Sequence, residues 1–423
     1  MSQMAARIER VLWVACPILL FAVMFGHMTA VVFQALALLA IGTLAAAWSA
    51  RRGGRPHWPL VVPIAAWAAW SLASVAWSYA PSTSLHAWLD EVLYPFVAFW
   101  GFWLLGTKTE RPARFVFVSW IACALLALTS VIYWGRLQPP TADTFLLHFY
   151  NRVGHTSTLA LFAMTLFSGV LLRTRWRWAG VAGIVLCLFI GLATLNRFFW
   201  VAAAVTLLIA LYPLYRRHLV LAAVAVAIIA GAGLGSLEIS SRIRLGEAIA
   251  VPAQGDFHIG AHQIYLPHAL EGIGDTVSGD TRPRLWAFYR SAGARHTWLG
   301  IGFGKPLPGL AYHGEMPAAL LKFESQALTH AHNLFLNTWL QTGVVGLTLQ
   351  IVLLLCVVER FWRLRRVDPW LCAAGIALVI GMITKNLTDD FMWQTTMLAF
   401  WSFAGLMLGC GDRLRDRRAL LRN

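Results

Sequence analysis

The chain has 423 residues, of which 59% are hydrophobic and 13% are charged, and it contains 21 Trp. A soluble domain carries about a quarter charged residues, so this composition excludes an ordinary soluble protein and indicates a membrane protein. The formal net charge of +15 is spread over many short segments and forms no single basic domain, which argues against nucleic-acid binding.

Apolar stretches recur along the whole chain, and several reach the roughly 20 residues that a helical span needs. The first follows Arg7 and Arg10 as a signal peptide would, but no small-residue cleavage site follows it, so we expect it to be retained. The pattern predicts an all-α polytopic membrane protein with about twelve transmembrane helices. The predicted spans are 11–26, 28–48, 58–77, 92–106, 115–134, 156–172, 178–195, 198–215, 219–237, 333–358, 369–385 and 391–410.

The distribution of basic residues predicts the orientation of these spans. With the N-terminus in the cytoplasm, the segments predicted to lie inside hold 22 of the 34 Lys and Arg residues. The short outside loops hold four: Arg136, Arg152, Arg197 and Lys385. Short cytoplasmic loops are enriched in Lys and Arg, so we expect both termini to be cytoplasmic and the long loop to lie outside.

Metal and cofactor sites are not predicted. All six cysteines fall inside apolar runs, with no spacing typical of a disulfide, a zinc site or a redox pair. His258, His262 and His268 are irregularly spaced, and no acidic ligand is obvious nearby, which argues against zinc.

A single charged residue, Arg197, stands near the middle of the apolar stretch 178–215. Two spans joined by a very short loop would place it at the outer face or slightly below it. An arginine that reaches back to the interface is the simpler explanation. The neighbouring sequence "ATLNRFFW" offers no acidic partner, however, and a charge inside a membrane is a functional candidate. We therefore predict that Arg197 binds substrate.

The segment 238–332, between the ninth and tenth spans, is the only extramembrane segment large enough to fold. We expect a helical lid over an outward-facing cavity, inserted in a single catalytic domain that comprises residues 1–423. One helix is predicted at "TRPRLWAFYRSAGAR", and it places Arg282 and Arg284 at its start. Guanidinium groups and helix N-termini both bind phosphate oxygens, although solvated arginines on loops are common.

The stretch "HAHNLFLNTWLQTGVVG" puts polar residues at the mouth of the tenth span. Asn333, Asn337 and Gln341 recur every four residues and share one helix face, which must contact protein or water instead of lipid. Gly343 and Gly346 would allow close approach of another helix. An imidazole at the rim suits a general base, so we predict that His332 is catalytic; an interface histidine satisfied by water is the alternative.

Two further polar segments are expected at the outer face. "KNLTDDF" contains Lys385, Asp389 and Asp390, and "HFYNRVGHTS" contains Arg152 and His155. We take Asn333, Asp389 and Arg152 as candidate substrate-binding residues, although ordinary loop polarity explains such segments equally well.

Chemistry on the outer side of the membrane has no nucleotide to draw on, so it must use a donor already activated on a lipid. A cationic cavity containing Arg197 and Arg282 fits a diphosphate leaving group, whose developing charge the arginines would stabilise. His332 would deprotonate an incoming sugar hydroxyl. An anion transporter would use the same arginines without chemistry, but inverted repeats typical of transporters are not found.

Four motifs resemble those of the O-antigen ligase family. His332, Asn333, Gly343 and Gly346 match its pattern H-[NSQ]-x9-G-x-x-[GTY]. "RPRLW" resembles its Arg-x-x-x-Trp helix opening, carried here by Arg282 and Trp286. "LNRFFW" resembles the arginine-bearing junction, and "KNLTDDF" the acidic segment before the last span.

This resemblance implies a glycosyltransferase-C-like membrane fold and a metal-independent, inverting glycosyl transfer that uses no cofactor. The family transfers O-antigen polysaccharide from undecaprenyl pyrophosphate to lipid A–core oligosaccharide at the periplasmic face of the bacterial inner membrane. Arg197 and Arg282 would then hold the pyrophosphate and His332 would activate the acceptor, with the choice between Arg282 and Arg284 left open. O-antigen polymerases and protein O-oligosaccharyltransferases share much of the pattern and remain alternatives.

Overall fold

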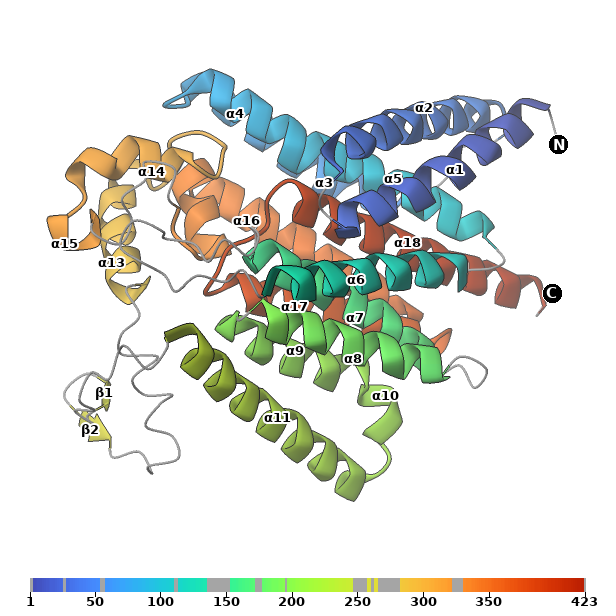
Figure 1. Cartoon of the computed structure of the whole chain (residues 1–423). Coiled ribbons are helices and arrows are strands. Elements are labelled where there is room, and N and C mark those ends of the chain that lie inside the picture. The colour runs from blue at the N-terminus through green and yellow to red at the C-terminus, as the bar shows by residue number, and fades with distance from the viewer. Residues whose placement is uncertain are drawn as a thin grey trace.

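The computed structural model describes residues 3–25, 28–53, 58–109, 113–134, 153–171, 177–194, 196–245, 257–259, 262–264, 282–321 and 330–421. Within these ranges the protein is a bundle of long helices that carries a group of short helices at one end (Figure 1). A two-stranded antiparallel hairpin, β1 (Phe257–Ile259) and β2 (His262–Ile264), lies in the segment that was expected to form a helical lid, so the all-α prediction is wrong at this point.

The N-terminal half of the bundle comprises α1 to α7 with their short extensions. Their bounds are α1 Gln3–Phe25, α2 Thr29–Gly53, α3 Val61–Ala73, η1 Ser74–Trp77, α4 Pro81–Trp88, η2 Leu89–Leu93, α5 Tyr94–Lys108, α6 Ala113–Trp134 and α7 Val153–Leu171. Helices α4, η2 and α5 follow one another without a break in the chain.

The described residues after α7 form further long helices and several short ones. Their bounds are α8 Arg177–Ala193, α9 Arg197–Ala210, α10 Tyr212–Tyr215, α11 Leu219–Leu245, α13 Arg282–Gly293, η4 Ala294–His296, α14 Leu307–Tyr312, η5 His313–Glu315, α15 Ala318–Leu321, α16 Leu334–Arg363, η6 Leu364–Arg366, α17 Pro369–Asn386 and α18 Thr395–Leu420.

Each of the twelve predicted spans coincides with a helix of the bundle. Among the described residues, four segments are long and apolar enough to cross a membrane by length and composition: Ala6–Phe25, Thr29–Trp48, Leu334–Arg366 and Pro369–Asn386. Six shorter apolar helices accompany them. The protein is therefore a membrane-embedded helical protein, while the count of twelve crossings stays a prediction.

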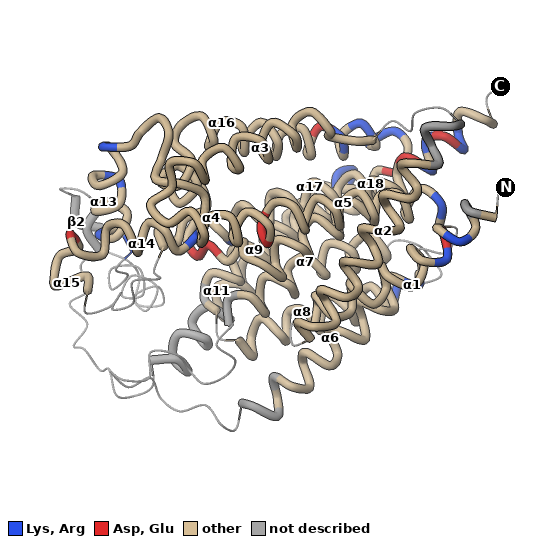
Figure 2. The backbone as a smooth tube through the Cα atoms, turned by 90° about the horizontal axis from the view of Figure 1, so that it is seen from above, with Lys and Arg blue, Asp and Glu red and all other residues tan. Residues whose placement is uncertain are grey.

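The two ends of the bundle differ in what they carry. Both termini lie at one end, where the lysines and arginines of the helix ends gather (Figure 2). Helices α13, α14 and α15 lie at the opposite end (Figure 1). This separation agrees with the predicted orientation, in which basic segments and termini share one side and the long loop lies on the other.

Helices α5 and α18 pack closely through glycines. A Cβ atom added at Gly405 or Gly409 of α18 would overlap the carbonyl oxygens of Phe99 and Trp103 on α5. Small residues let helix backbones approach in this way where apolar solvent gives little drive for association. The pair holds α18 in place, and with it the connection 387–394 that precedes α18.

Helix α16 is interrupted at Gly343, whose φ of 68° and ψ of −172° are not helical. The sequence predicted that Gly343 would admit a neighbouring helix, and this prediction is wrong. A Cβ atom at Gly343 would overlap the carbonyl of Trp298, which belongs to a loop. Gly346 does face a helix, since Trp70 of α3 lies beside it.

Candidate active site

A glycine-rich loop, Thr297–Lys305, docks on the interruption of α16. The amides of Ile301 and Gly302 donate to the carbonyls of Leu340 and Gln341 at 3.0 and 2.9 Å. The amide of Val344 donates to the Thr297 carbonyl at 2.9 Å. The loop thus pairs with helix carbonyls that the irregularity at Gly343 leaves without their usual intrahelical partners.

The loop can run this close to α16 because its glycines adopt conformations that other residues avoid. Gly300, Gly302 and Gly304 have φ angles of 70°, 109° and 145°. Residues that carry a Cβ rarely adopt such φ angles. The chain then turns toward the bundle and delivers Lys305, whose side chain is buried.

His332 sits in a sharp turn immediately before α16. Its φ of 49° is unusual for a residue other than glycine, and such conformations persist only where the surroundings enforce them. Asn333 caps α16, since its Oδ1 accepts from the Leu336 amide at 2.9 Å, while its Nδ2 donates to the Leu387 carbonyl at 2.8 Å. Trp286 of α13 donates through Nε1 to the Ala331 carbonyl at 2.7 Å. The turn is therefore held by α13 and by the connection before α18.

Asp389 lies in that connection and is surrounded by positive charge. Its Oδ2 accepts from Nζ of Lys385 at 2.9 Å and from Nδ2 of Asn196 at 3.1 Å. Its Oδ1 is 3.5 Å from Nη2 of Arg282 and 4.0 Å from Nδ1 of His332. Four segments distant in the chain meet at this one carboxylate.

The charge of Asp389 is maintained by these neighbours. Burial raises the pKa of Asp389, but the positive charges of Lys385 and Arg282 outweigh burial and lower it to about 2. The carboxylate is therefore ionised throughout the neutral range. It can fix the imidazole of His332 in one orientation.

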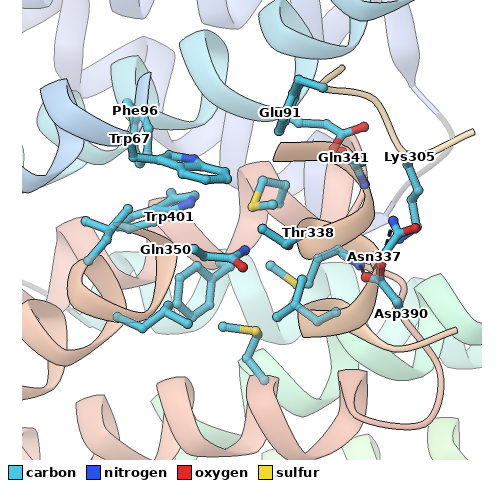
Figure 3. A pocket seen from close by; sticks show the side chains of 18 residues that line it. Trp67, Glu91, Phe96, Lys305, Asn337, Thr338, Gln341, Gln350, Asp390 and Trp401 are labelled. Carbon is cyan, nitrogen blue, oxygen red and sulfur yellow. Dashed lines mark hydrogen bonds and ion pairs between the residues drawn. The ribbon is translucent and has the colours of Figure 1, made fainter. Parts of the chain in front are cut away.

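Asp390 faces the other way, into the bundle. Its Oδ1 is 2.9 Å from Nζ of Lys305, and its Oδ2 accepts a long hydrogen bond of 3.4 Å from Nδ2 of Asn337. Figure 3 shows Lys305, Asn337 and Asp390 with their side-chain ends directed toward one another. The polar stripe predicted on α16 therefore contacts protein, with Asn337 on Asp390 and Gln341 accepting from the Gly304 amide at 2.8 Å.

His330 packs on His332, with ring centroids 4.3 Å apart. Burial, together with the positive charges of His332 and Lys305, holds the pKa of His330 well below its usual range. Nε2 of His330 lies 3.0 Å from the carbonyl of Asp390. A carbonyl only accepts, so Nε2 carries the proton. His330 is thus a neutral support for His332 with one ring nitrogen already engaged.

The arginines expected to bind substrate differ in their placement. Arg282 is half-buried, contacts Asp389, and stacks its guanidinium 4.4 Å from the ring centroid of Phe198. Arg284, on the same helix, is exposed to solvent. Arg197 is the first residue of α9, directly after Asn196, which reaches Asp389. Arg152 lies outside the described residues.

A small cavity of about 50 Å³ lies behind Asp390, between the loop, α16, η2 and the last two helices. Its polar wall includes Glu91, Lys305 and Asp390, and Trp67, Phe96 and Trp401 lie on the far side (Figure 3). The volume has room for only a few water molecules. It is too small for a sugar, so the candidate active site is the outer face of Asp389 with Arg282 and His332.

Sequence reasoning did not single out Asn196, Lys305 or Asp390 as site residues. Lys385 was expected in a short outer loop, yet it forms the buried last turn of α17. Lys305 had one visible signal, because it follows directly on the glycines of "GIGFG". Its partner was hidden by a separation of 85 residues along the chain.

The fold and the site together define a membrane-embedded helical protein with a buried charge cluster at one end of the bundle. Residues 144–351 match the family model described as O-antigen ligase. The chain therefore carries an O-antigen ligase family domain, and the resemblance read from its motifs is confirmed. A search of curated proteins found no match to the chain.

The match includes three of the four motifs that carried the resemblance. Arg197, the Arg282–Trp286 helix opening and the motif from His332 to Gly346 all lie within it. The segment "KNLTDDF" lies beyond residue 351, so the match does not test its likeness to the family. This segment belongs to the candidate active site because its Asp389 contacts Arg282 and His332.

Proposed function

We propose that the protein transfers O-antigen polysaccharide from undecaprenyl pyrophosphate to lipid A–core oligosaccharide at the periplasmic face of the inner membrane. The observation that carries the proposal is the meeting of Arg282, His332 and Asp389, from three separate segments, within a chain of the O-antigen ligase family. Membership gives the class of reaction, and the cluster gives groups suited to it.

His332 is the proposed base that removes the proton from the acceptor hydroxyl. Its Nδ1 faces Asp389, and the proposal assigns Nε2 to the acceptor hydroxyl. The separation of 4.0 Å is longer than a hydrogen bond, and contacts of this kind often tighten only when substrate binds. Asp389 orients the base, which refines its predicted role as a substrate-binding residue.

Arg282 and Arg197 are the proposed cations for the pyrophosphate leaving group. As the glycosidic bond to the pyrophosphate breaks, negative charge grows on the leaving oxygen, and cations placed there stabilise the transition state. Attack by the acceptor oxygen on the opposite face of the sugar inverts the anomeric centre. Asn333 serves this proposal by holding the His332 turn, since both ends of its amide contact the backbone. No metal or cofactor is assigned a role.

An O-antigen polymerase is the alternative within the family. It would use the same donor and the same base, with a growing glycan in place of lipid A–core as acceptor. An anion transporter belongs to a different class and would retain its function without His332.

The test is a strain that lacks the protein, with its lipopolysaccharide separated by gel electrophoresis. The ligase proposal expects loss of the O-antigen ladder on lipid A–core and accumulation of undecaprenyl-linked polymer. Single repeats still attached to the core would indicate a polymerase instead. Complementation with His332→Ala should fail, and full complementation by that variant would overturn the proposed base.

A further inference from the structure

Lys305 and Asp390 form an ion pair beside the candidate active site, yet neither is assigned to the transfer reaction. Nζ of Lys305 is 2.9 Å from Oδ1 of Asp390, and each side chain is 3% exposed. Removing two charges from water is unfavourable, and apolar residues of similar size often serve stability as well. The pair is therefore poorly explained as a stabilising contact alone.

The backbone that carries Lys305 is held in place by hydrogen bonds. The loop that carries it is tied to α16 through the amide of Gly302 and to η1 through the amide of Phe303, which donates to Oγ of Ser74 at 3.0 Å. The amide of Gly304 donates to Oε1 of Gln341. Residues directly before Lys305 are thus anchored to two helices, and its side chain extends from a rigid base.

Asp390 fixes the connection between α17 and α18. Its Oδ1 also accepts from the Met392 amide at 3.2 Å, and its carbonyl lies 3.0 Å from Nε2 of His330. The next residue toward the N-terminus is Asp389, which faces Arg282 and His332. Any shift of Asp390 along the direction of Lys305 must move Asp389 relative to His332.

We propose that Lys305 and Asp390 are positioning residues that hold Asp389 against His332 and Arg282. The inference deepens the proposed function and rests on it for the roles of His332 and Arg282. The glycine-rich loop then has a task in the reaction: it delivers the cation that sets the geometry of the base.

A direct electrostatic effect of the two charges on the base is the rival explanation, and it predicts a different pH dependence. Nδ1 of His332 lies 4.0 Å from Asp389, the imidazole packs on the ring of His330, and Arg282 contacts the same carboxylate. Transfer falls at low pH where the base is protonated. Loss of the Lys305 charge would directly move this acidic limb to higher pH, and loss of the Asp390 charge would move it to lower pH.

If the two residues act by positioning Asp389, both single variants should shift the acidic limb of the pH profile in the same direction. Lys305→Met and Asp390→Asn each release the connection, so the Asp389 carboxylate moves away from the imidazole and the limb moves to lower pH. Transfer should fall by about tenfold or more in each. The double variant Lys305→Met/Asp390→Asn carries no unpaired buried charge. Its acidic limb should return to the wild-type pH, and most of the transfer activity should return with it.

The experiment combines the pH profile of transfer with hydrogen exchange of the full-length protein in detergent. Exchange is followed at the amides of Phe391 and Met392, which donate to the side chains of Asn386, the last residue of α17, and of Asp390. Both single variants should exchange at least about threefold faster there, and the double variant should match the wild type. Arg295→Gln is the control, because it breaks an exposed ion pair with Glu315 on the same lid.

An unpaired buried charge destabilises a fold, so Asp390→Glu is measured with the single variants. It keeps the charge and lengthens the side chain by one methylene group, and it should move the limb to lower pH at normal membrane levels. Opposite shifts in Lys305→Met and Asp390→Asn would overturn the inference, as would unchanged exchange at Phe391 and Met392. Absence of transfer by the wild type would refute the proposed function alone, because the exchange result still decides whether the pair holds the connection.

Discussion

At the scale of residues, the site is organised around a carboxylate. Asp389 contacts Arg282, Lys385, Asn196 and His332, and so it neutralises part of the positive charge that the sequence pattern had assigned to substrate. A compensated cation can be held in a dehydrated site until a diphosphate arrives. In the proposed reaction the carboxylate would therefore prepare both His332 and Arg282 for an anionic substrate.

The two arginines at the start of α13 should differ in importance. Arg282→Ala removes a guanidinium that lies between Asp389 and Phe198, and we expect transfer to fall about 100-fold because a preorganised cation is lost. Arg284→Ala removes an exposed side chain and should retain at least about half of the activity. Both are measured as ladder formation in the complemented deletion strain.

Arg290→Ala, at an exposed position on the same helix, controls for changes in surface charge. Equal losses in Arg282→Ala and Arg284→Ala, with Arg290→Ala unaffected, would mean that the diphosphate contacts the outer face of α13 and not the Asp389 cluster.

Acid should weaken the protein through Asp389. Its pKa is about 2 in the folded protein against an ordinary 3.8, so the unfolded chain binds the proton more readily. The resulting stabilisation, about 2 kcal/mol, is present above pH 4 and is lost as the pH falls toward 2. Thermal unfolding in detergent at pH 6, 4 and 3 measures it.

The neutral pair Lys385→Met/Asp389→Asn should lose less stability between pH 4 and pH 3 than the wild type does, whereas Asp416→Asn, at an exposed carboxylate on α18, should follow the wild type. If the neutral pair loses as much stability between pH 4 and pH 3 as the wild type does, other groups dominate the acid response.

At the scale of elements, the site depends on an interrupted helix. Helix α16 presents Asn337 and Gln341 toward protein, as the four-residue spacing predicted, because a polar stripe in a membrane must avoid lipid. The spacing could not show what covers that stripe. The covering loop is held through backbone hydrogen bonds and positive φ angles, and neither depends on side-chain patterns that periodicity detects.

The sequence predicted the features that depend on local patterns and missed those that depend on contacts between distant segments. Helix positions and the polar face come from local periodicity, and the family motifs marked His332 and Arg282. The pairing of Lys305 with Asp390 joins distant segments that carry no common local pattern. Burial of Lys385 was missed because a lysine beside "NLTDD" reads as a loop residue until its partner Asp389 is placed.

Gly343→Ala should disrupt the junction between α16 and the loop. The substitution adds a Cβ that overlaps the Trp298 carbonyl at a residue with a φ of 68°, so we expect a loss of at least about 2 kcal/mol in stability and nearly complete loss of transfer. Gly314→Ala is the matched control, because an added Cβ there meets nothing within 4 Å. Membrane levels and melting temperature in detergent measure the effect, and a normal Gly343→Ala protein would contradict the docking of the loop.

At the scale of the whole molecule, the two ends of the bundle are chemically distinct. The termini and the basic helix ends share one end, and the site with its lid lies at the other (Figures 1 and 2). A lipid-linked donor is amphipathic, with its diphosphate at the membrane surface and its chain in the bilayer. A charge cluster where α9 and α16 begin and α17 ends is suited to such a substrate, provided that this end faces the periplasm.

The predicted topology can be tested with single cysteines. Gly314→Cys on the lid should react with a membrane-impermeant maleimide added outside intact spheroplasts, and Leu420→Cys, 76% exposed near the end of α18, should react only after the membrane is permeabilised. The native cysteines are buried or half-buried, and their replacement by alanine removes background labelling. Labelling of Leu420→Cys from outside would reverse the orientation and place the Asp389 cluster on the cytoplasmic side, where a periplasmic transfer to lipid A–core has no access to it.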